Sequence, residues 1–445
     1  MSTLPIFMTC AAGVESLLDE EIKRILPGAK IYPQRGGVRL DGGPSEVMAL
    51  NLHSRLAQRV LIQVGEIQYA NATASDEPPF RRDAADRTQA VDENALYEMA
   101  LGIDWTQWIT PQQTMRVDSK ATNSPIHSLN FANLRIKDGV CDSLRNATGE
   151  RPSVDTRAPD LPLVLHLGPQ WASLYVDSSG EPLFKRGWRE DKGDAPLKET
   201  LAAAMLAAAG WRGTPDAGGA LMDPCCGSGT IAIEAAQIAR NMAPGMQRRF
   251  AFERLAPFCS TEMRAQWQRL KSQAKSAERP CAVPIHCSDV AFRMVDFARR
   301  NAERAGVLDC IEFHGGDALE RPAPVLPDGM SGTLMMNPPY GERIEVRGKA
   351  GVHSLTSRDV AGNEERQATD SDFFSRLASH WKRAYTLQTP GWTAWLLCPD
   401  MKLPNLMRLK AARRVPMWNG PIECRLFRFD LVAGSARDKP ASLIH

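Results

Sequence analysis

Residues 220–230 have the sequence Ala-Leu-Met-Asp-Pro-Cys-Cys-Gly-Ser-Gly-Thr, in which a short apolar strand runs into a glycine-containing turn. A helix is expected to begin at Thr230, directly after the turn. Glycine has no Cβ, so Gly227 and Gly229 allow the backbone to approach a ligand closely. In open α/β folds such a turn lies at the carboxyl edge of a parallel sheet, where ligands bind. The stretch therefore predicts an α/β fold with a ligand at this turn, although a purely structural tight turn is the alternative.

The sequence after about residue 181 alternates between expected strands and helices. Strands are predicted at 220–222, 283–286, 311–314, 333–336 and 392–398, and helices at 196–209, from 230 onward and at 290–305. Such alternation implies parallel strands with helices packed on both faces. Asn419-Gly420 lies between two further expected strands and predicts an antiparallel edge hairpin. Because proline lacks the N–H donor of a central strand, the strand near Pro284 is expected to begin after it.

The first 180 residues have a mixed α+β pattern. Strands are expected at 6–9, 38–40, 60–67, 114–118, 161–167 and 171–176, and helices at 14–26, 44–56, 91–101 and 131–144. The helix at 131–144 is predicted to turn Leu134, Val140 and Leu144 toward a core. Residues 69–88 are polar and mark a loop or boundary, whereas 345–371 and 433–445 are too polar to bury and are expected to be mobile.

The composition is that of a globular protein: 445 residues, 43% hydrophobic and 24% charged. No apolar run reaches the roughly 18 residues of a membrane helix, and the N-terminus lacks a secretory signal, so a cytoplasmic location is expected. The ten cysteines contain no C-x-x-C and do not cluster with the eight histidines. The sequence therefore predicts no disulfide framework and no metal site.

Charge is distributed unevenly along the chain. Residues 1–180 contain 17 Lys and Arg against 22 Asp and Glu, whereas residues 401–445 contain 9 basic and 3 acidic side chains. A basic face near one end is compatible with a phosphate-backbone partner, but a solvated surface gives the same count.

Two carboxylates follow later strands of the predicted sheet. Asp289 and Asp317 are expected at the same edge as Gly227, where they could accept hydrogen bonds from ribose hydroxyls and an adenine amine. Asp289 could equally cap the next helix, and Asp317 could be a turn residue. Gly227-x-Gly229-x-x-Ala232 also fits the nucleotide fingerprint of nicotinamide enzymes, but the acid expected about 20 positions later is missing.

Asn337-Pro338-Pro339-Tyr340 follows the apolar strand at 333–336. Two prolines remove backbone donors and hold the residues before them extended, so the turn is predicted to be a rigid array of acceptors. Asn337 adds a side-chain carbonyl that accepts from an amino group, and Tyr340 offers a face for stacking a base. Acceptors that hold the hydrogens of an exocyclic amine stabilise the positive charge it gains while attacking a methyl group.

These motifs together resemble the class I S-adenosylmethionine-dependent methyltransferases of the amino-methylating type. More narrowly, the chain resembles the bacterial THUMP-containing guanine-N2 methyltransferases of large-subunit ribosomal RNA. The resemblance extends over nearly the whole chain and includes Thr9-Cys-x-x-Gly-Val-Glu15, Arg135-Ile-Lys-Asp-Gly-Val-Cys-Asp142, Arg151-Pro-Ser-Val-Asp155, Arg186-Gly-Trp-Arg189, Ala195-Pro-Leu-Lys-Glu199 and Asn337-Pro-Pro-Tyr-Gly-Glu-Arg343.

The resemblance implies a Rossmann-like methyltransferase sheet at 181–445, mostly parallel with an antiparallel edge hairpin, preceded by a ferredoxin-like domain at 1–65 and a THUMP RNA-binding domain at 66–180. The sequence departs from the family in one respect: we expect it to lack the second methyltransferase module that is fused C-terminally in some relatives.

The resemblance also assigns roles to residues. S-adenosylmethionine would be held by Asp223, Pro224, Cys225, Gly227, Gly229 and Thr230 at its methionine end, by Asp289 at its ribose, by Asp317 and Ala318 at its adenine, and by Asn337. The guanine would be oriented by Asn337, Pro338, Pro339 and Tyr340, which are the catalytic candidates. RNA-contact candidates are Arg135, Lys137, Arg151 and Arg343, although the first two fit a solvated helix face equally well.

The expected substrate is 23S rRNA or a large-subunit precursor, with no membrane partner and with the oligomeric state left open. Three alternatives remain: an adenine-N6 or other amino-methyltransferase acting on nucleic acid, a nicotinamide-dependent oxidoreductase, and a non-catalytic RNA-binding protein.

Overall fold

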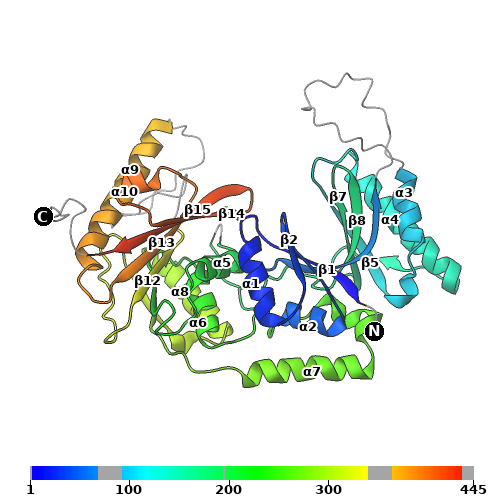
Figure 1. Ribbon diagram of the computed structural model, residues 1–445, viewed down its shortest axis with the longest axis horizontal. Coiled ribbons are helices and arrows are strands. Elements are labelled where there is room, and N and C mark those ends of the chain that lie inside the picture. Colours follow the sequence, from blue (N-terminus) through cyan, green and yellow to red (C-terminus); the bar gives the residue numbers. More distant parts are fainter. Residues whose placement is uncertain (1–2, 69–92, 194–195, 339–362, 433–445) are drawn as a thin grey trace, which may run out of the picture. The chain divides into compact units, whose positions relative to one another are not determined.

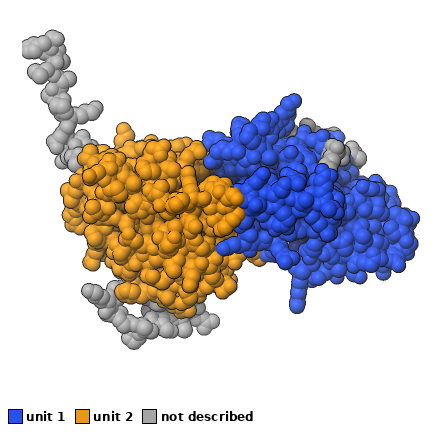
Figure 2. Space-filling view, turned by 90° about the horizontal axis from the view of Figure 1, so that it is seen from below, with its two compact units in different colours: residues 1–10, 18–183, 244–274 blue, residues 11–17, 184–243, 275–445 orange. Residues whose placement is uncertain are grey.

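The computed structural model describes residues 3–68, 93–193, 196–338 and 363–432. The chain forms two compact units, each assembled from segments that are not contiguous in sequence (Figure 2). Unit 1 contains residues 1–10, 18–183 and 244–274, and unit 2 contains residues 11–17, 184–243 and 275–445. Within the described ranges, no helix has both the length and the apolar character needed to cross a membrane.

Unit 1 is built on one eight-stranded sheet. Its strands are β1 (Leu4–Thr9), β2 (Ile31–Gln34), β3 (Gly37–Gly42), β4 (Arg59–Gln68), β5 (Thr114–Ala121), β6 (Ser153–Val154), β7 (Leu161–Leu167) and β8 (Trp171–Asp177). They lie in the order β2-β3-β1-β4-β8-β7-β5-β6. β4 pairs antiparallel with β8 along nearly its whole length, so the segments predicted as two domains share one sheet. β4 also runs across residue 65; the boundaries at 65 and 180 stay predictions.

Helices lie between several of these strands in sequence. They are α1 (Glu15–Ile25), α2 (Pro44–His53), α3 (Glu93–Leu101), the 3₁₀ helix η3 (Trp105–Gln107) and α4 (Leu129–Thr148). α4 begins where the Ser128 hydroxyl accepts a hydrogen bond from the Phe131 backbone N–H at 3.3 Å. It ends at Gly149, whose φ of +84° suits glycine.

The buried face of α4 differs in one position from the predicted face. Val140 and Leu144 are buried, which confirms two of the three predicted core residues. Leu134 was expected beside them, but 44% of its surface is exposed. Ile136, four residues before Val140, faces inward instead, because positions four apart lie on one side of a helix.

Unit 2 is organised around a seven-stranded sheet (Figure 1). Its strands are β9 (Ala220–Asp223), β10 (Ile285–Asp289), β11 (Ile311–Gly315), β12 (Gly332–Met336), β13 (Trp392–Cys398), β14 (Arg413–Asn419) and β15 (Ile422–Leu431). They lie in the order β11-β10-β9-β12-β13-β15-β14. β9 to β13 run parallel, whereas β15 is antiparallel to both β13 and β14. The predicted Rossmann-like sheet with an antiparallel edge hairpin is therefore confirmed.

Helices cover both faces of this sheet. The remaining helices of the described residues are α5 (Glu199–Ala208), α6 (Thr230–Ala239), η4 (Ala251–Arg254), η5 (Ala256–Phe258), α7 (Thr261–Ser276), α8 (Phe292–Arg304), η6 (Leu308–Cys310), α9 (Asn363–Ala384) and α10 (Leu403–Met407). α6 and α8 pack on β9, β10 and β11. Trp392 of β13 and Phe427 of β15 belong to a hydrophobic core that also contains Trp381 of α9 and Met407 of α10. All of β12 is buried, as expected of a parallel strand covered on both faces.

The start of β10, the edge hairpin and the polar segments can each be compared with their predictions. β10 begins directly after Pro284, as predicted. The hairpin exists, but Asn419 pairs with Ile422, so its loop is Gly420-Pro421 rather than Asn419-Gly420. Gly420 has a φ of +64°, which suits the first central position of a type II′ turn. Of the segments predicted to be mobile, 363–371 belongs to α9, while 345–362 and 433–445 lie outside the described residues.

Candidate functional site

The polar residues predicted as a site lie at one edge of the unit 2 sheet. Asp223 ends β9, Asp289 ends β10, Asp317 follows β11 by two residues, and Asn337 directly follows β12. Because these four strands are parallel, their carboxyl ends meet at the same edge. The chain order of the strands reverses at β9, which has β10 on one side and β12 on the other. Open α/β sheets bind ligands at this kind of reversal point.

Asp223 is a buried carboxylate with an unused oxygen. Its side chain is 1% exposed, and Oδ1 accepts a hydrogen bond from the Cys225 backbone N–H at 3.2 Å. Oδ2 is also buried but has no partner among the described residues. Burial raises the pKa of Asp223 well above its usual value, and the nearby Asp289 charge raises it further. A buried acceptor without a partner is costly, so this oxygen fits a cationic ligand that carries N–H donors.

The two glycines of the turn have different surroundings. Gly227 has a φ of +51°, and a Cβ built on it would meet no atom within 4 Å. Gly229 has a φ of +88°, and a Cβ there would lie 2.8 Å from the Cβ of Ala298 on α8. Gly229 is therefore required by close packing inside the protein. Gly227 instead faces open space, as expected where a ligand approaches the backbone.

Asp289 fastens the turn to the sheet. Its Oδ2 accepts a hydrogen bond from the Gly227 backbone N–H, and its Oδ1 accepts one from the Ala291 N–H, both at 2.9 Å. Its side chain does not cap α8, whose N-cap residue is Ala291. Burial raises the pKa of Asp289. Each carboxylate oxygen can accept a second hydrogen bond, so the predicted role toward a ribose remains chemically open.

Three carboxylates act electrostatically on Cys225. Burial raises the pKa of its thiol well above the usual value, and the charges of Asp223, Asp289 and Asp317 raise it further. Asp317 closes its own turn, since its Oδ1 accepts a hydrogen bond from the Leu319 N–H at 2.9 Å. The intervening Ala318 is buried. Three carboxylates around one side chain favour a ligand that carries positive charge or several hydrogen-bond donors.

The turn after β12 is described only in part. Asn337 is half-buried, and its Oδ1 is a buried atom with no partner among the described residues. Pro338 is buried. Pro339, Tyr340 and Arg343 lie outside the described residues. At this edge Asn337 thus presents a second unsatisfied acceptor beside that of Asp223.

An arginine to which the sequence assigned no role in the site holds the glycine turn in place. Arg189 donates to the hydroxyls of Ser228 and Thr230, each at 2.8 Å. Its Nε donates to Oε1 of Glu199 at 2.8 Å, and the two side chains are 12% and 3% exposed. The Thr230 hydroxyl, predicted to contact a cofactor, thus accepts a hydrogen bond from Arg189. Arg189 and Glu199 both occur in motifs of the resemblance. Because the two motifs are separate in sequence, the contact between these side chains could not be predicted from them.

A fully buried asparagine supports the same turn from α8. The Asn301 amide donates to the backbone oxygens of Ser228 at 3.1 Å and Asp191 at 2.8 Å. Asp191 in turn forms ion pairs with Arg300 and Arg304 at 2.9 and 2.6 Å, and these arginines hold its pKa well below the usual range. The turn is therefore fixed by buried side chains from both neighbouring segments.

The predicted RNA-contact residues of unit 1 have different surroundings. The Arg135 guanidinium lies 4.8 Å from the Tyr97 ring centroid and donates to Asn94 at 2.6 Å. Lys137 forms an ion pair with its neighbour Asp138 at 2.7 Å. Arg151 is exposed. Their contact with RNA stays a prediction.

Three segments of the chain match known protein families. Residues 5–61 match the RlmL ferredoxin-like domain, residues 90–177 match the THUMP domain, and residues 186–358 match the family described as RMKL-like, methyltransferase domain. The order of the three matches is the order that the sequence predicts.

Curated relatives are named ribosomal RNA large subunit methyltransferase K/L. The one from Alteromonas mediterranea is 33% identical over 96% of this chain and 54% of its own length. The one from Psychromonas ingrahamii is 34% identical over 95% of this chain and 50% of its own length. The chain spans about half the length of the curated relatives it matches.

Solved structures share the fold. SMU.472, crystallised in complex with SAH, superimposes with a TM-score of 0.76 at 24% identity, covering 98% of this chain and all of the other. A predicted N6-adenine-specific DNA methylase from Listeria monocytogenes gives a TM-score of 0.74 at 24% identity, covering 96% of each chain.

Proposed function

We propose that this chain, which carries an RlmL ferredoxin-like, a THUMP and an RMKL-like methyltransferase domain, methylates ribosomal RNA. The methyl group would come from S-adenosylmethionine and go to the exocyclic N2 of a guanine in 23S rRNA or a large-subunit precursor. The observation that carries this proposal is a pair of buried acceptors without partners, Asp223 Oδ2 and Asn337 Oδ1, at the reversal point of the sheet.

The residues present fit S-adenosylmethionine. Its methionine end is cationic, which suits Asp223 Oδ2, and the open space at Gly227 leaves room for a ligand against the backbone. Asp289 and Asp317 offer acceptors for the nucleoside end, on the strands beyond β9. The cofactor would supply a methyl group that is already activated on a sulfonium. The named relatives and a fold neighbour solved with SAH support this assignment.

Asn337 would act on the substrate amine. Its Oδ1 lies at the end of β12, the strand beside β9, and lacks a partner. An amine conjugated to a purine is a poor nucleophile, and it becomes positively charged as it attacks. An acceptor placed at its N–H bonds binds this charged state more strongly than the ground state. The reaction needs no strong base, because the methylated amine is very acidic until it loses a proton to water near Asn337.

The choice of guanine N2 rests on the resemblance of the whole motif set. The same acceptor geometry would serve adenine N6, the reaction that the fold neighbour from Listeria monocytogenes is named for. The THUMP segment supports RNA rather than DNA as the substrate. The product of the reaction is therefore the decisive observation.

The test is transfer of a labelled methyl group to undermodified 23S rRNA, followed by nucleoside analysis. We expect N2-methylguanosine from the wild type, and a loss of about 100-fold or more in rate for Asn337→Ala. SAH binding by the variant should stay within about twofold of the wild type. The matched control is Asn405→Ala, an exposed asparagine in α10, which should have wild-type activity.

Three results would contradict the proposal. N6-methyladenosine as the product would overturn the guanine assignment, and an Asn337→Ala variant of full activity would remove the role given to this side chain. Failure of the wild type to bind SAH would overturn the cofactor assignment.

A further inference from the structure

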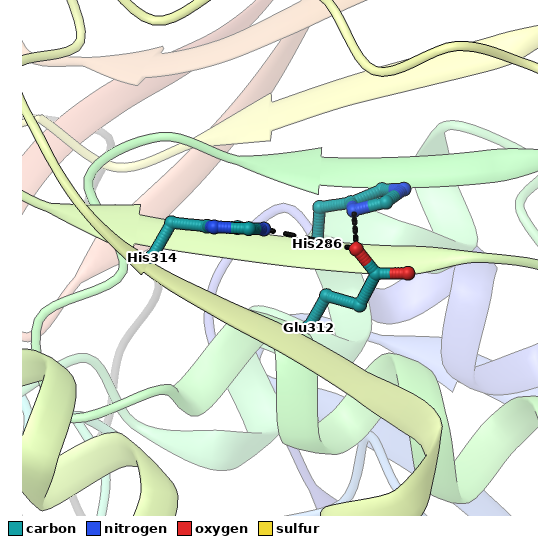
Figure 3. A group of neighbouring side chains, drawn as sticks. All are labelled: His286, Glu312 and His314. Atoms are coloured by element: carbon teal, nitrogen blue, oxygen red, sulfur yellow. Dashed lines mark ion pairs between the residues drawn. The ribbon is translucent and has the colours of Figure 1, made fainter.

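Three potential metal ligands meet on β10 and β11, away from the carboxyl edge of the sheet. Figure 3 shows His286, Glu312 and His314 with both imidazoles directed at the Glu312 carboxylate. His286 pairs with Glu312 in the parallel register of the two strands. Glu312 and His314 are two residues apart on β11, so their side chains leave the same face of the sheet. The backbone therefore brings all three side chains together.

Two of the distances among these side chains are close to those between the ligands of one ion. The Nδ1 atom of His286 lies 3.2 Å from Oε2 of Glu312, and Nε2 of His314 lies 3.7 Å from the same oxygen. The three ligand atoms all lie within 4.8 Å of one another. Bonds of about 2.0 to 2.1 Å in a tetrahedral zinc site put neighbouring ligand atoms about 3.3 to 3.4 Å apart.

Burial divides the group into a fixed part and an accessible part. His286 is 7% exposed, and its Nε2 is buried without a partner among the described residues. Glu312 and His314 have side chains that are 66% and 37% exposed. The buried histidine cannot leave the group easily, whereas the other two give an ion a path from solvent.

The charges around His286 include one that opposes a cation. Burial lowers the pKa of His286, while the Glu312 charge acts in the opposite direction. His314 and Arg321 are the other titratable groups that act on it. The Arg321 guanidinium repels a bound cation, so its removal should strengthen binding.

We propose that His286, Glu312 and His314 bind one divalent transition-metal ion of the Zn²⁺ type, with the fourth position open to water. Two imidazoles and one carboxylate are a known ligand set for Zn²⁺. The spacing of these residues in the sequence does not predict the site, because the ligands come from two separate strands. The ion would link β10 to β11. His286 lies three residues before Asp289, and His314 lies three residues before Asp317.

The test is a calorimetric titration of Zn²⁺ into the full chain, repeated with Co²⁺, whose absorption spectrum reports coordination geometry. We expect one equivalent to bind, with affinity at least about tenfold lower in Glu312→Gln and in His314→Ala. Both substitutions are at accessible positions, so they should leave the fold intact. Arg321→Gln should bind the ion more tightly than the wild type.

Two control variants separate this site from other ligands. His127→Ala removes an exposed histidine elsewhere, and Cys310→Ser removes a half-buried thiol of unit 2; both should bind Zn²⁺ as the wild type does. SAH binding should be unchanged in His314→Ala, so the result does not depend on the proposed function. Absence of binding at millimolar Zn²⁺, unchanged affinity in His314→Ala, or loss of binding in Cys310→Ser instead would each overturn the proposal.

Discussion

Gly227 and Gly229 allow a paired test of the turn, because alanine at each position meets different surroundings. Both glycines have positive φ values, +51° and +88°. An added Cβ at Gly227 has no neighbour within 4 Å, whereas at Gly229 it would lie 2.8 Å from the Ala298 Cβ and 3.1 Å from its Cα. The first substitution therefore introduces backbone strain alone, and the second adds a steric clash with α8.

The structure sets the expected magnitudes. A left-handed backbone costs a non-glycine residue about 1 to 2 kcal/mol, so Gly227→Ala should lower the free energy of unfolding by about that much. Gly229→Ala should lose about 2 to 5 kcal/mol, because overpacking against a helix adds about 1 to 3 kcal/mol. If the cofactor occupies the open space at Gly227, the new methyl group should weaken SAH binding by about tenfold or more, which is about 1.4 kcal/mol.

Urea denaturation of both variants and calorimetric titration of SAH into Gly227→Ala would measure these effects. Wild-type SAH affinity in Gly227→Ala would refute the conclusion that a ligand lies against this backbone. Equal losses of stability in the two variants would refute the contrast drawn between open space and close packing.

Two further predictions concern buried charge. Burial raises the folded-state pKa of Asp223, so its contribution to stability is full below the unfolded pKa and is lost as the pH rises through the folded pKa. In urea denaturation Asp223→Asn should therefore be more stable than the wild type at about pH 8 and equal to it near pH 4. The variant should also bind SAH more weakly. A variant as stable as the wild type at both pH values would contradict the prediction for stability. Arg186→Met breaks an ion pair to Glu234 at 3.0 Å, in which the side chains are 2% and 0% exposed, and should cost about 3 to 5 kcal/mol. The double variant with Glu234→Leu should recover most of that loss; a double variant as unstable as the single one would contradict the pairing.

Much of the unit 2 sheet was predictable because most of its strands are short apolar runs between clear turn signals. Trp392–Cys398 matches its predicted range, and the strand after Pro284 begins where the missing N–H donor requires. The hairpin turn lies one residue later than predicted. Gly420-Pro421 is as suitable for a type II′ turn as Asn419-Gly420 is for a type I′ turn, so the sequence alone did not distinguish the two positions.

Other elements escaped prediction for identifiable reasons. β2 contains Pro33 and has largely exposed side chains, so neither strand propensity nor alternation marks this edge strand. α7 is mostly polar, and only a sparse stripe of Met263, Trp267 and Ala274 is buried. Leu134 on α4 shows the opposite error, because an apolar residue near the helical stripe can still face solvent.

The site was predictable where its residues are adjacent in sequence. The turn with Gly227 and Gly229 and the motif at Asn337 could be recognised locally. The contacts of Arg189 with Glu199 and of Asn301 with Ser228 could not, because they depend on which segments pack together. Local patterns thus predict which residues lie at the carboxyl edge of the sheet, whereas the residues that hold them in place are seen only in the folded structure.

The pairing of β4 with β8 has a consequence for how the N-terminal half of the chain can be divided. A fragment that begins at residue 66 would lack residues 59–65 of β4 and would leave Leu174 to Asp177 of β8 without the residues they pair with in that strand. Unpaired strands of this length recruit other chains and promote aggregation. The chain therefore has no cut point at residue 65 that leaves the THUMP segment with all of its strand pairs.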